Sequence, residues 1–307
     1  MVPHRILLLL FFLSGINAQI ALPTFQGVHK PHTAGASSLY DFTTHTFTNC
    51  GATGRNGPTL ANCISSYNTS WENNTDYFNV SSDAGIQYWT VPSSGTYTIE
   101  AWGSTGGVGA TYSHYYVSQG GEGRKLKANF NLQAGDVLKI LVGQSGEDTG
   151  SGCCCAGGCG GGTFITYSNN TAIIVGSGGN GGNWGYFLVD GPDGLFSNAG
   201  NTNGGSVNGR GGSGGGLTGD GTNFSGSDKG ISFTNGGAGG TTNYSSAGDG
   251  GFGCGGGGYN GGTVVNTNQY NTEYPSYGAG SFTAEGAGSI VDIGTNDGVG
   301  KVVITKN

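Results

Sequence analysis

One stretch of this chain, Gly143 to Gly262, is so rich in glycine that few side chains in it can build a core. Glycine loses more backbone entropy on folding than any other residue. A sequence with 67 glycines and only 9% charged residues therefore has the composition of a disordered, low-complexity protein. The segments on either side, however, alternate apolar and polar residues. A glycine tract framed by strand patterns predicts a folded structure and not a flexible tail.

Two segments show the two-residue alternation of half-buried strands, Thr96 to Trp102 and Lys125 to Leu132. Shorter runs rich in β-branched residues and bounded by Gly, Asn or Asp predict four more strands. These four runs are Asp136 to Val142, Thr163 to Tyr167, Thr171 to Val175 and Lys301 to Thr305. We expect no amphipathic helix after the N-terminal segment. The pattern predicts an all-β fold built from antiparallel sheets.

The last predicted strand follows the glycine tract, so both ends of the sequence must complete the sheets. This order favours one discontinuous domain over residues 46–307, with residues 46–148 and 263–307 forming a β-sandwich or jelly roll. Residues 149–262 would be a glycine-rich insertion. Glycine chains can approach closely, and in a polyproline II type conformation their N–H and C=O groups are free to bond to neighbours. We therefore expect a packed bundle of glycine helices. The absence of a strict Gly-X-Y repeat excludes a collagen triple helix.

The N-terminus has the pattern of a secretory signal peptide over residues 1–18. Arg5 supplies the positive start, an apolar run follows, and the exit at Ala18 has small residues. Residues 19–45 are polar and broken by Pro and Gly, which predicts a flexible leader. No later segment is long and apolar enough to span a bilayer. We expect a soluble, secreted, extracellular protein.

Seven cysteines in an oxidising compartment indicate disulfides first and metal ligands second. Cys50 and Cys63 bracket a loop and are expected to pair with each other. The remaining cysteines would staple glycine segments together. They are Cys153, Cys154, Cys155, Cys159 and Cys254. Since the count is odd, one unpaired thiol could link two copies into a homo-oligomer. No neighbouring His completes a zinc or copper motif, so we predict neither a metal nor a cofactor.

Asn-x-Ser/Thr sequons predict a glycoprotein with solvent-facing loops. They lie at Asn68, Asn73, Asn79, Asn169, Asn223 and Asn243. The cluster from Asn68 to Asn79 is the strongest of these, because it lies in a polar, turn-rich stretch between predicted strands.

The sequence offers no set of residues for catalysis. Glycine-rich chains match Gly-x-Gly-x-x-Gly by chance, and no match opens a helix after a strand. The segment Gly294 to Lys301 lacks the phosphate-loop spacing, and the His residues lie mainly in the leader. We therefore predict that the chain is not an enzyme. Its formal net charge of −7 argues against nucleic acid and anionic membranes and favours a basic partner.

Aromatic and acidic residues coincide between Gln269 and Glu285. Such a combination is typical of a rim that binds a basic protein. The candidate rim residues are Glu273, Tyr274, Tyr277 and Glu285. The tyrosines here, together with those between Tyr112 and Tyr116, also leave open an adhesive or lectin-like function, in which the rings would stack on sugars.

Several segments, in order, resemble the glycine-rich extracellular domain of the anaplastic lymphoma kinase and leukocyte tyrosine kinase receptors. They are FTNCGATGRNGPTLANC (47–63), WTVPSSGTYTIEAWGSTGGVGA (89–110), LKILVGQSGED (138–148), GGGTFI (160–165), AIIVGSGGNGG (172–182) and GGFGCGGGGYNGG (250–262). The resemblance extends over residues 46–306. It implies a tumour-necrosis-factor-like β-sandwich with an inserted bundle of polyglycine II helices, which binds small basic cytokines and dimerises on doing so.

The chain also departs from that family. It carries none of the kinase motifs, and the cysteines from Cys153 to Cys159 have no counterpart. The function that we predict is a secreted binding module that captures a secreted or cell-surface protein ligand, of which a basic cytokine is one example, as a soluble receptor-like domain. Two alternatives stay open. One is a matrix or coat protein cross-linked through glycine helices and disulfides, and the other is the adhesive or lectin-like domain.

Overall fold

The computed structural model of the chain describes residues 38–81, 85–110, 117–149, 156–183, 190–196, 214–223, 228–242, 247–253, 255, 257–262 and 279–307. The chain divides into two units, Met1–Ala36 and Ser37–Asn307. The first unit, which includes the predicted signal peptide, lies outside the described residues, as does the leader up to residue 37.

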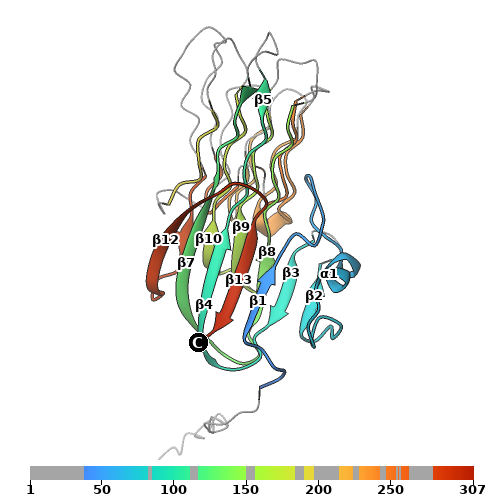
Figure 1. Ribbon diagram of the computed structural model, residues 1–307, viewed down its shortest axis with the longest axis vertical. Coiled ribbons are helices and arrows are strands. Elements are labelled where there is room, and N and C mark those ends of the chain that lie inside the picture. The colour runs from blue at the N-terminus through green and yellow to red at the C-terminus, as the bar shows by residue number, and fades with distance from the viewer. Residues whose placement is uncertain are drawn as a thin grey trace, which may run out of the picture. The chain divides into compact units, whose positions relative to one another are not determined.

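The second unit contains two antiparallel sheets packed face to face, with sheet A in front of sheet B in Figure 1. Sheet A has the strand order β1-β13-β4-β7-β12, and sheet B the order β11-β10-β9-β8-β3-β2. The strands of sheet A are β1 (Thr44–Phe47), β13 (Lys301–Lys306), β4 (Gly95–Trp102), β7 (Gly123–Leu132) and β12 (Gly288–Asn296). Those of sheet B are β11 (Phe282–Thr283), β10 (Ala172–Gly176), β9 (Thr163–Tyr167), β8 (Val137–Leu141), β3 (Gln87–Thr90) and β2 (Phe78–Val80). Two short strands, β5 (Gly109–Ala110) and β6 (Val117–Ser118), pair with each other. The prediction of an all-β, antiparallel sandwich is confirmed.

The alternating segments form the centre of sheet A. Tyr97 and Ile99 of β4 stand opposite Phe130 and Ala128 of β7, and all four side chains are buried. The polar residues between them face the other side of the sheet. The six predicted strands are all present, as β4, β7, β8, β9, β10 and β13.

Aromatic rings fill the space between the sheets. Phe47, Tyr67, Trp71 and Trp89 are buried and in ring contact with one another through Phe47. A second apolar cluster lies where the sheets meet the glycine-rich segments. It includes Leu141, Phe164, Val175, Phe233 and Phe252.

One short helix was not predicted from the sequence. Helix α1 (Leu60–Ser66) begins at a capping box in which Thr59 and Asn62 bond to each other's backbone N–H groups. It buries Cys63, which is bonded to Cys50 as predicted. A single-turn 3₁₀ helix (Phe233–Asn235) lies in the glycine-rich part. The sequence was expected to hold no amphipathic helix, and α1 has only Cys63 buried, so this short helix depends on its cap and on the disulfide and not on an apolar face.

The structure differs from the expected division of the chain at two places. Strand β1 begins at Thr44, and Tyr40 and Phe42 before it pack against the core, so part of the expected leader is ordered. Strands β9 and β10 belong to sheet B although they lie within residues 149–262. Their side chains are almost all buried, because these runs are apolar enough to join the sandwich. The glycine-rich part is therefore a set of loops leaving the sheets, interrupted by two strands.

These glycine segments run beside one another and bond through their backbones, above the sheets as drawn in Figure 1. The amide N–H groups of Ser104 and Gly107 donate to the carbonyls of Gly161 and Gly158. Those of Gly103 and Gly106 donate to Arg124 and Gly121 on a different segment. Along residues 103–107, a hydrogen bond to the same neighbouring segment recurs after three residues. One segment thereby bonds to several neighbours in different directions, as a β-strand cannot.

The close approach of these segments requires glycine. A Cβ atom added to Gly161 would lie 1.7 Å from the carbonyl oxygen of Phe252, and one added to Gly158 would lie 1.8 Å from that of Asp249. Real Cβ atoms do not approach backbone oxygens so closely. Glycine is thus required where segments of the chain pack against each other and not only in turns.

Candidate ligand-binding surface

Strand β12 forms one edge of sheet A and, among the described strands, pairs with β7 alone. Its register shifts twice, between Gly288 and Val291 and between Asp292 and Thr295. Ser289 and Gly294, within these intervals, have positive φ angles of 49° and 96°. Ile290 and Val291 are 48% and 46% exposed, which is unusual for aliphatic residues in a strand. Because bulges twist an edge away from regular pairing, this edge is suited to recognition by side chains more than to addition of a strand.

A glycine segment, residues 190–196, lies next to the start of β7. The N–H groups of Gly191 and Gly194 donate to the carbonyls of Gln119 and Glu122. In return, the carboxylates of Asp190 and Asp193 accept the N–H groups of Gln119 and Glu122 at 2.7 and 2.8 Å. The acidic side chains therefore satisfy backbone donors that the glycine segments leave open. Leu195 and Phe196 at the end of the segment are 43% and 46% exposed.

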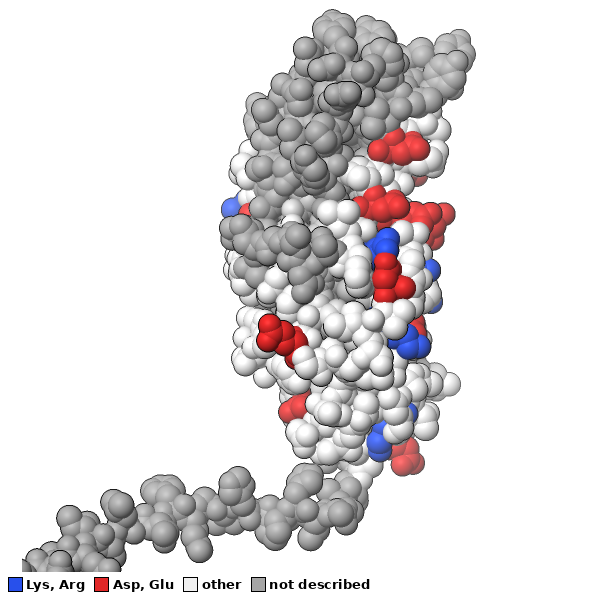
Figure 2. Space-filling model, turned by 90° about the vertical axis from the view of Figure 1, so that its left-hand side faces the viewer, with Lys and Arg blue, Asp and Glu red and all other residues white. Residues whose placement is uncertain are grey.

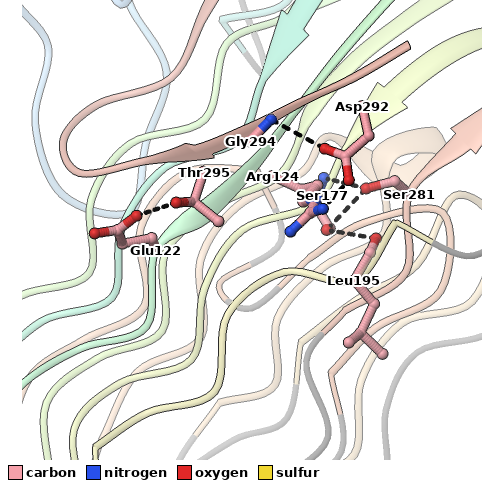
Figure 3. Close-up of polar contacts among 8 residues, drawn as sticks. All are labelled: Glu122, Arg124, Ser177, Leu195, Ser281, Asp292, Gly294 and Thr295. Atoms are coloured by element: carbon pink, nitrogen blue, oxygen red, sulfur yellow. Dashed lines mark hydrogen bonds and ion pairs between the residues drawn. The ribbon is translucent and has the colours of Figure 1, made fainter. Parts of the chain in front are cut away.

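A polar cluster joins β12 to this segment (Figure 3). Arg124 forms an ion pair with Asp292, whose other oxygen accepts the N–H of Gly294 at 3.0 Å. The hydroxyl of Thr295 donates to Glu122. The Ser177 hydroxyl contacts the hydroxyl of Ser281 at 3.0 Å and the Leu195 carbonyl at 3.4 Å.

These contacts connect β12 with residues 190–196 through Arg124 and Ser177. We define the β12 surface by its exposed residues, which are Asp193, Leu195, Phe196, Glu285, Ile290 and Val291.

The β12 surface combines apolar and acidic side chains. Arg124 neutralises Asp292, whereas the exposed carboxylates of Asp190, Asp193 and Glu285 form no ion pair with a described residue. Figure 2 views the molecule from the side on which Figure 1 draws β12, and it shows acidic and basic groups interspersed along one border of the described surface, with further acidic groups away from it. Exposed aliphatic and aromatic residues beside carboxylates are suited to a protein surface that presents apolar and basic groups. The arrangement offers hydrogen-bond acceptors and apolar contact area.

Of the predicted rim residues, Glu285 is exposed in the turn that precedes β12. Glu273, Tyr274 and Tyr277 lie outside the described residues. The exposed residues of β12 and of residues 190–196 were missed in the sequence. The signal for them was the run Ser289-Ile-Val-Asp-Ile293, which is β-branched but is enclosed by glycines and was not assigned to a strand.

The predicted glycosylation residues Asn68, Asn73, Asn79, Asn169 and Asn223 are all exposed, and Asn243 lies outside the described residues. Of the remaining cysteines, Cys159 has a free thiol, whose sulfur accepts the N–H of Gly181 at 3.4 Å. Burial raises the pKa of this thiol. Cys153, Cys154, Cys155 and Cys254 are not described. Among the described residues, no group of three or more His, Cys, Asp or Glu side chains could hold a metal ion.

A cleft of about 740 Å³ lies between the loop before α1, the end of β2 and the glycine segment around Phe252. Its described lining is apolar, hydroxyl or amide in character, and includes Leu60, Val80, Asn235 and Phe252. This lining supplies no acid, base or charged nucleophile for catalysis.

The comparisons with known proteins agree in part with the resemblance seen in the sequence. No model of a known protein family matches the chain. The chain is 39% identical over 105 residues to the leukocyte tyrosine kinase receptor of Mus musculus. The match covers 33% of this chain and 11% of the receptor. The chain is thus partly related to that receptor family and spans only a small part of the receptor's length. Within the described part of the chain, we find no helix with the length and hydropathy of a membrane span.

Proposed function

We propose that this chain is an extracellular, receptor-like module that captures a protein ligand with a basic surface, and that the β12 surface makes the contact. The observation that carries the proposal is the exposure of four apolar side chains on two segments that hydrogen bonds connect, together with the exposed carboxylates of Asp193 and Glu285. Apolar anchors supply most of the affinity at such surfaces, and rim charges set the encounter rate. The partial relationship to a receptor supports this function. A small basic cytokine is the ligand that we propose.

The glycine segments would serve as the rigid base of this surface. We propose that they are polyglycine II helices, because a conformation with three residues per turn directs a hydrogen bond to the same neighbour at every third residue. The observed bonds of Ser104 and Gly107 to a single segment support this assignment. A rigid base favours binding, because less conformational entropy is lost when the ligand docks.

The hydrogen bonds also favour a binding module over a cross-linked matrix protein. The glycine segments bond to one another within one molecule. Their backbone groups therefore have less need of a second chain. Secretion of the chain and glycosylation at the exposed sequons belong to the same proposal.

The test uses the full secreted chain and a purified basic cytokine of the class that the resembled receptors bind. The variant carries Glu285→Lys and Ile290→Ser, which reverse a charge and remove an apolar anchor, so its net charge changes by the same amount as that of the control below. We expect at least a hundredfold weaker binding in calorimetry or surface-based kinetics, because hot-spot residues dominate such interfaces. A matched control is Asp76→Lys, an exposed acidic residue before β2.

The control should change affinity by less than twofold. Equal loss in both variants would show that only net charge matters and would reject the β12 surface as the site. Unchanged binding in the first variant would reject it as well. If the unmodified chain binds no basic cytokine, the proposed ligand class is wrong.

A further inference from the structure

The outer face of sheet A carries a basic patch on an otherwise acidic protein. Lys301, Trp102 and Lys125 are direct cross-strand neighbours on β13, β4 and β7. Lys127 lies two residues further along β7, on the same face. No described element packs on this face, and the charged groups in Figure 2 lie mainly along the border toward sheet A.

The two lysines of the first row are held in place by the indole ring. The ammonium groups of Lys301 and Lys125 lie 3.6 and 4.8 Å from the ring centroid of Trp102. The indole N–H donates to Glu100 at 3.1 Å, and Glu100 in turn pairs with Lys127 at 3.2 Å. Cation–π contacts of this kind favour lysine positions over the ring even at exposed sites. The positive charges are thus partly ordered before any ligand binds.

Beyond this row the face is a ladder of hydroxyl and amide groups. Thr98 and Thr96 donate to the Oδ1 atoms of Asn129 and Asn131, both at 2.8 Å. The side-chain NH₂ groups of Asn129 and Asn131 remain available as donors to a ligand. The ladder and the lysines together extend along β4 from Thr96 to Trp102, or about 20 Å at 3.3 Å per residue.

We propose that this face binds an extended anionic polysaccharide, with the lysines contacting sulfate or carboxylate groups and the Thr/Asn ladder contacting sugar hydroxyls. A protein partner would need an apolar centre in the interface. The rows of β4, β7 and β13 have Val303 as their one aliphatic side chain on this face, and it is only partly exposed. The exposed Val291 lies at the edge of the face, on β12 opposite Lys127, and not at its centre. Charge complementarity and the hydrogen-bonding groups therefore favour a glycan over an acidic protein. This face borders the β12 surface, since Lys127 lies opposite Val291 in the register of β7 and β12, but the inference does not depend on the function proposed above.

The experiment measures binding of the full secreted chain to immobilised heparin, hyaluronan and dextran at increasing salt. Heparin carries sulfate groups, hyaluronan carries carboxylates alone and dextran is neutral. The test variant is Lys125→Gln with Lys301→Gln. The matched control is Lys139→Gln with Lys229→Gln, which removes the same charge from sheet B and from a glycine segment. All four residues are on the surface, so the fold is expected to persist, and circular dichroism of each variant checks this.

We expect retention on heparin, or on heparin and hyaluronan, and none on dextran. The test variant should bind at least tenfold more weakly with a flatter salt dependence, and the control should change less than twofold. Equal weakening in the two variants would overturn the proposal, because binding would then follow net charge alone. Absence of retention on both charged glycans would also overturn it, as would binding of polyglutamate but not of the glycans, which would assign the face to an acidic protein.

Discussion

The β-sandwich and the glycine segments pack in different ways. Side chains hold the two sheets of the sandwich together, whereas backbone contacts hold the glycine segments together. In the sandwich, large side chains such as Trp89 and Phe47 fill the space between two sheets and are fully buried. In the glycine segments, the absence of a side chain lets the backbones of residues such as Gly158 and Gly161 approach their neighbours directly. The first region is stabilised mainly by apolar burial and the second mainly by backbone hydrogen bonds and close contact. Removing a side chain should therefore damage the first, and adding one should damage the second.

The largest effect is expected from a deletion in the sandwich. Phe47→Ala removes a ring that contacts His45, Tyr67, Trp71 and Trp89. We expect a loss of about 3–5 kcal/mol in the free energy of unfolding, from lost burial and the cavity left behind. Urea unfolding followed by tryptophan fluorescence measures it. Phe47→Leu, which keeps most of the volume, should cost much less. If both variants lose the same amount, the aromatic cluster is not the main source of sandwich stability.

The sequence was informative wherever burial alternates along a strand. Thr96 to Trp102 was predicted because β4 is buried on one face only, which leaves a two-residue period in the sequence. Strand β12 was missed because none of its residues is buried and its register is irregular, so no such period exists. Pairing with β7, which is distant in sequence, makes it a strand. Helix α1 has only seven residues, too few to show a helical period.

The candidate site was predictable only in part for the same reason. Glu285 was identified from its charge near tyrosines, a local feature of composition. Leu195 and Phe196 were missed because they lie far in sequence from Ile290 and Val291, and the fold alone places them on one base through Ser177 and Arg124. The basic patch could not be predicted from the sequence either. Lys301 and Lys125 become neighbours only through the register of β13, β4 and β7.

The second prediction tests the other side of the comparison. Gly161→Ala would place a methyl group 1.7 Å from the Phe252 carbonyl oxygen, so the two segments must separate. We expect a loss of about 3 kcal/mol, at the upper end of ordinary overpacking costs. Gly95→Ala is the matched control, because an added Cβ there has only a Lys306 side-chain carbon at 3.8 Å.

The control should be neutral or slightly stabilising, by about 0.5 kcal/mol, since alanine loses less backbone entropy than glycine. Thermal unfolding of both variants decides between the outcomes. If Gly161→Ala unfolds like the unmodified chain, the close approach of the glycine segments is not required for stability.

The smallest effect concerns a histidine at the border of the aromatic cluster and is visible only as a dependence on pH. The His45 ring meets Phe47, Tyr67 and Trp71 edge to face, and its Nε2 atom has no hydrogen-bond partner among the described residues. Burial lowers the pKa of His45 from 6.5 to about 4, although nearby Glu72 acts in the opposite direction. The folded state thus favours neutral His45.

The stability that follows from this shift is fully present above the unfolded pKa of about 6.5 and is lost as the pH falls toward 4. We expect about 2 kcal/mol between these limits, less than the full pKa shift implies because the ring is partly exposed to solvent. Urea unfolding at steps between pH 4 and 7 measures it, with His45→Gln as the variant that cannot titrate. The difference in unfolding free energy between the two proteins should narrow as the pH falls. A constant difference would show that His45 has the same pKa folded and unfolded, and that the acid sensitivity of the sandwich comes from its carboxylates.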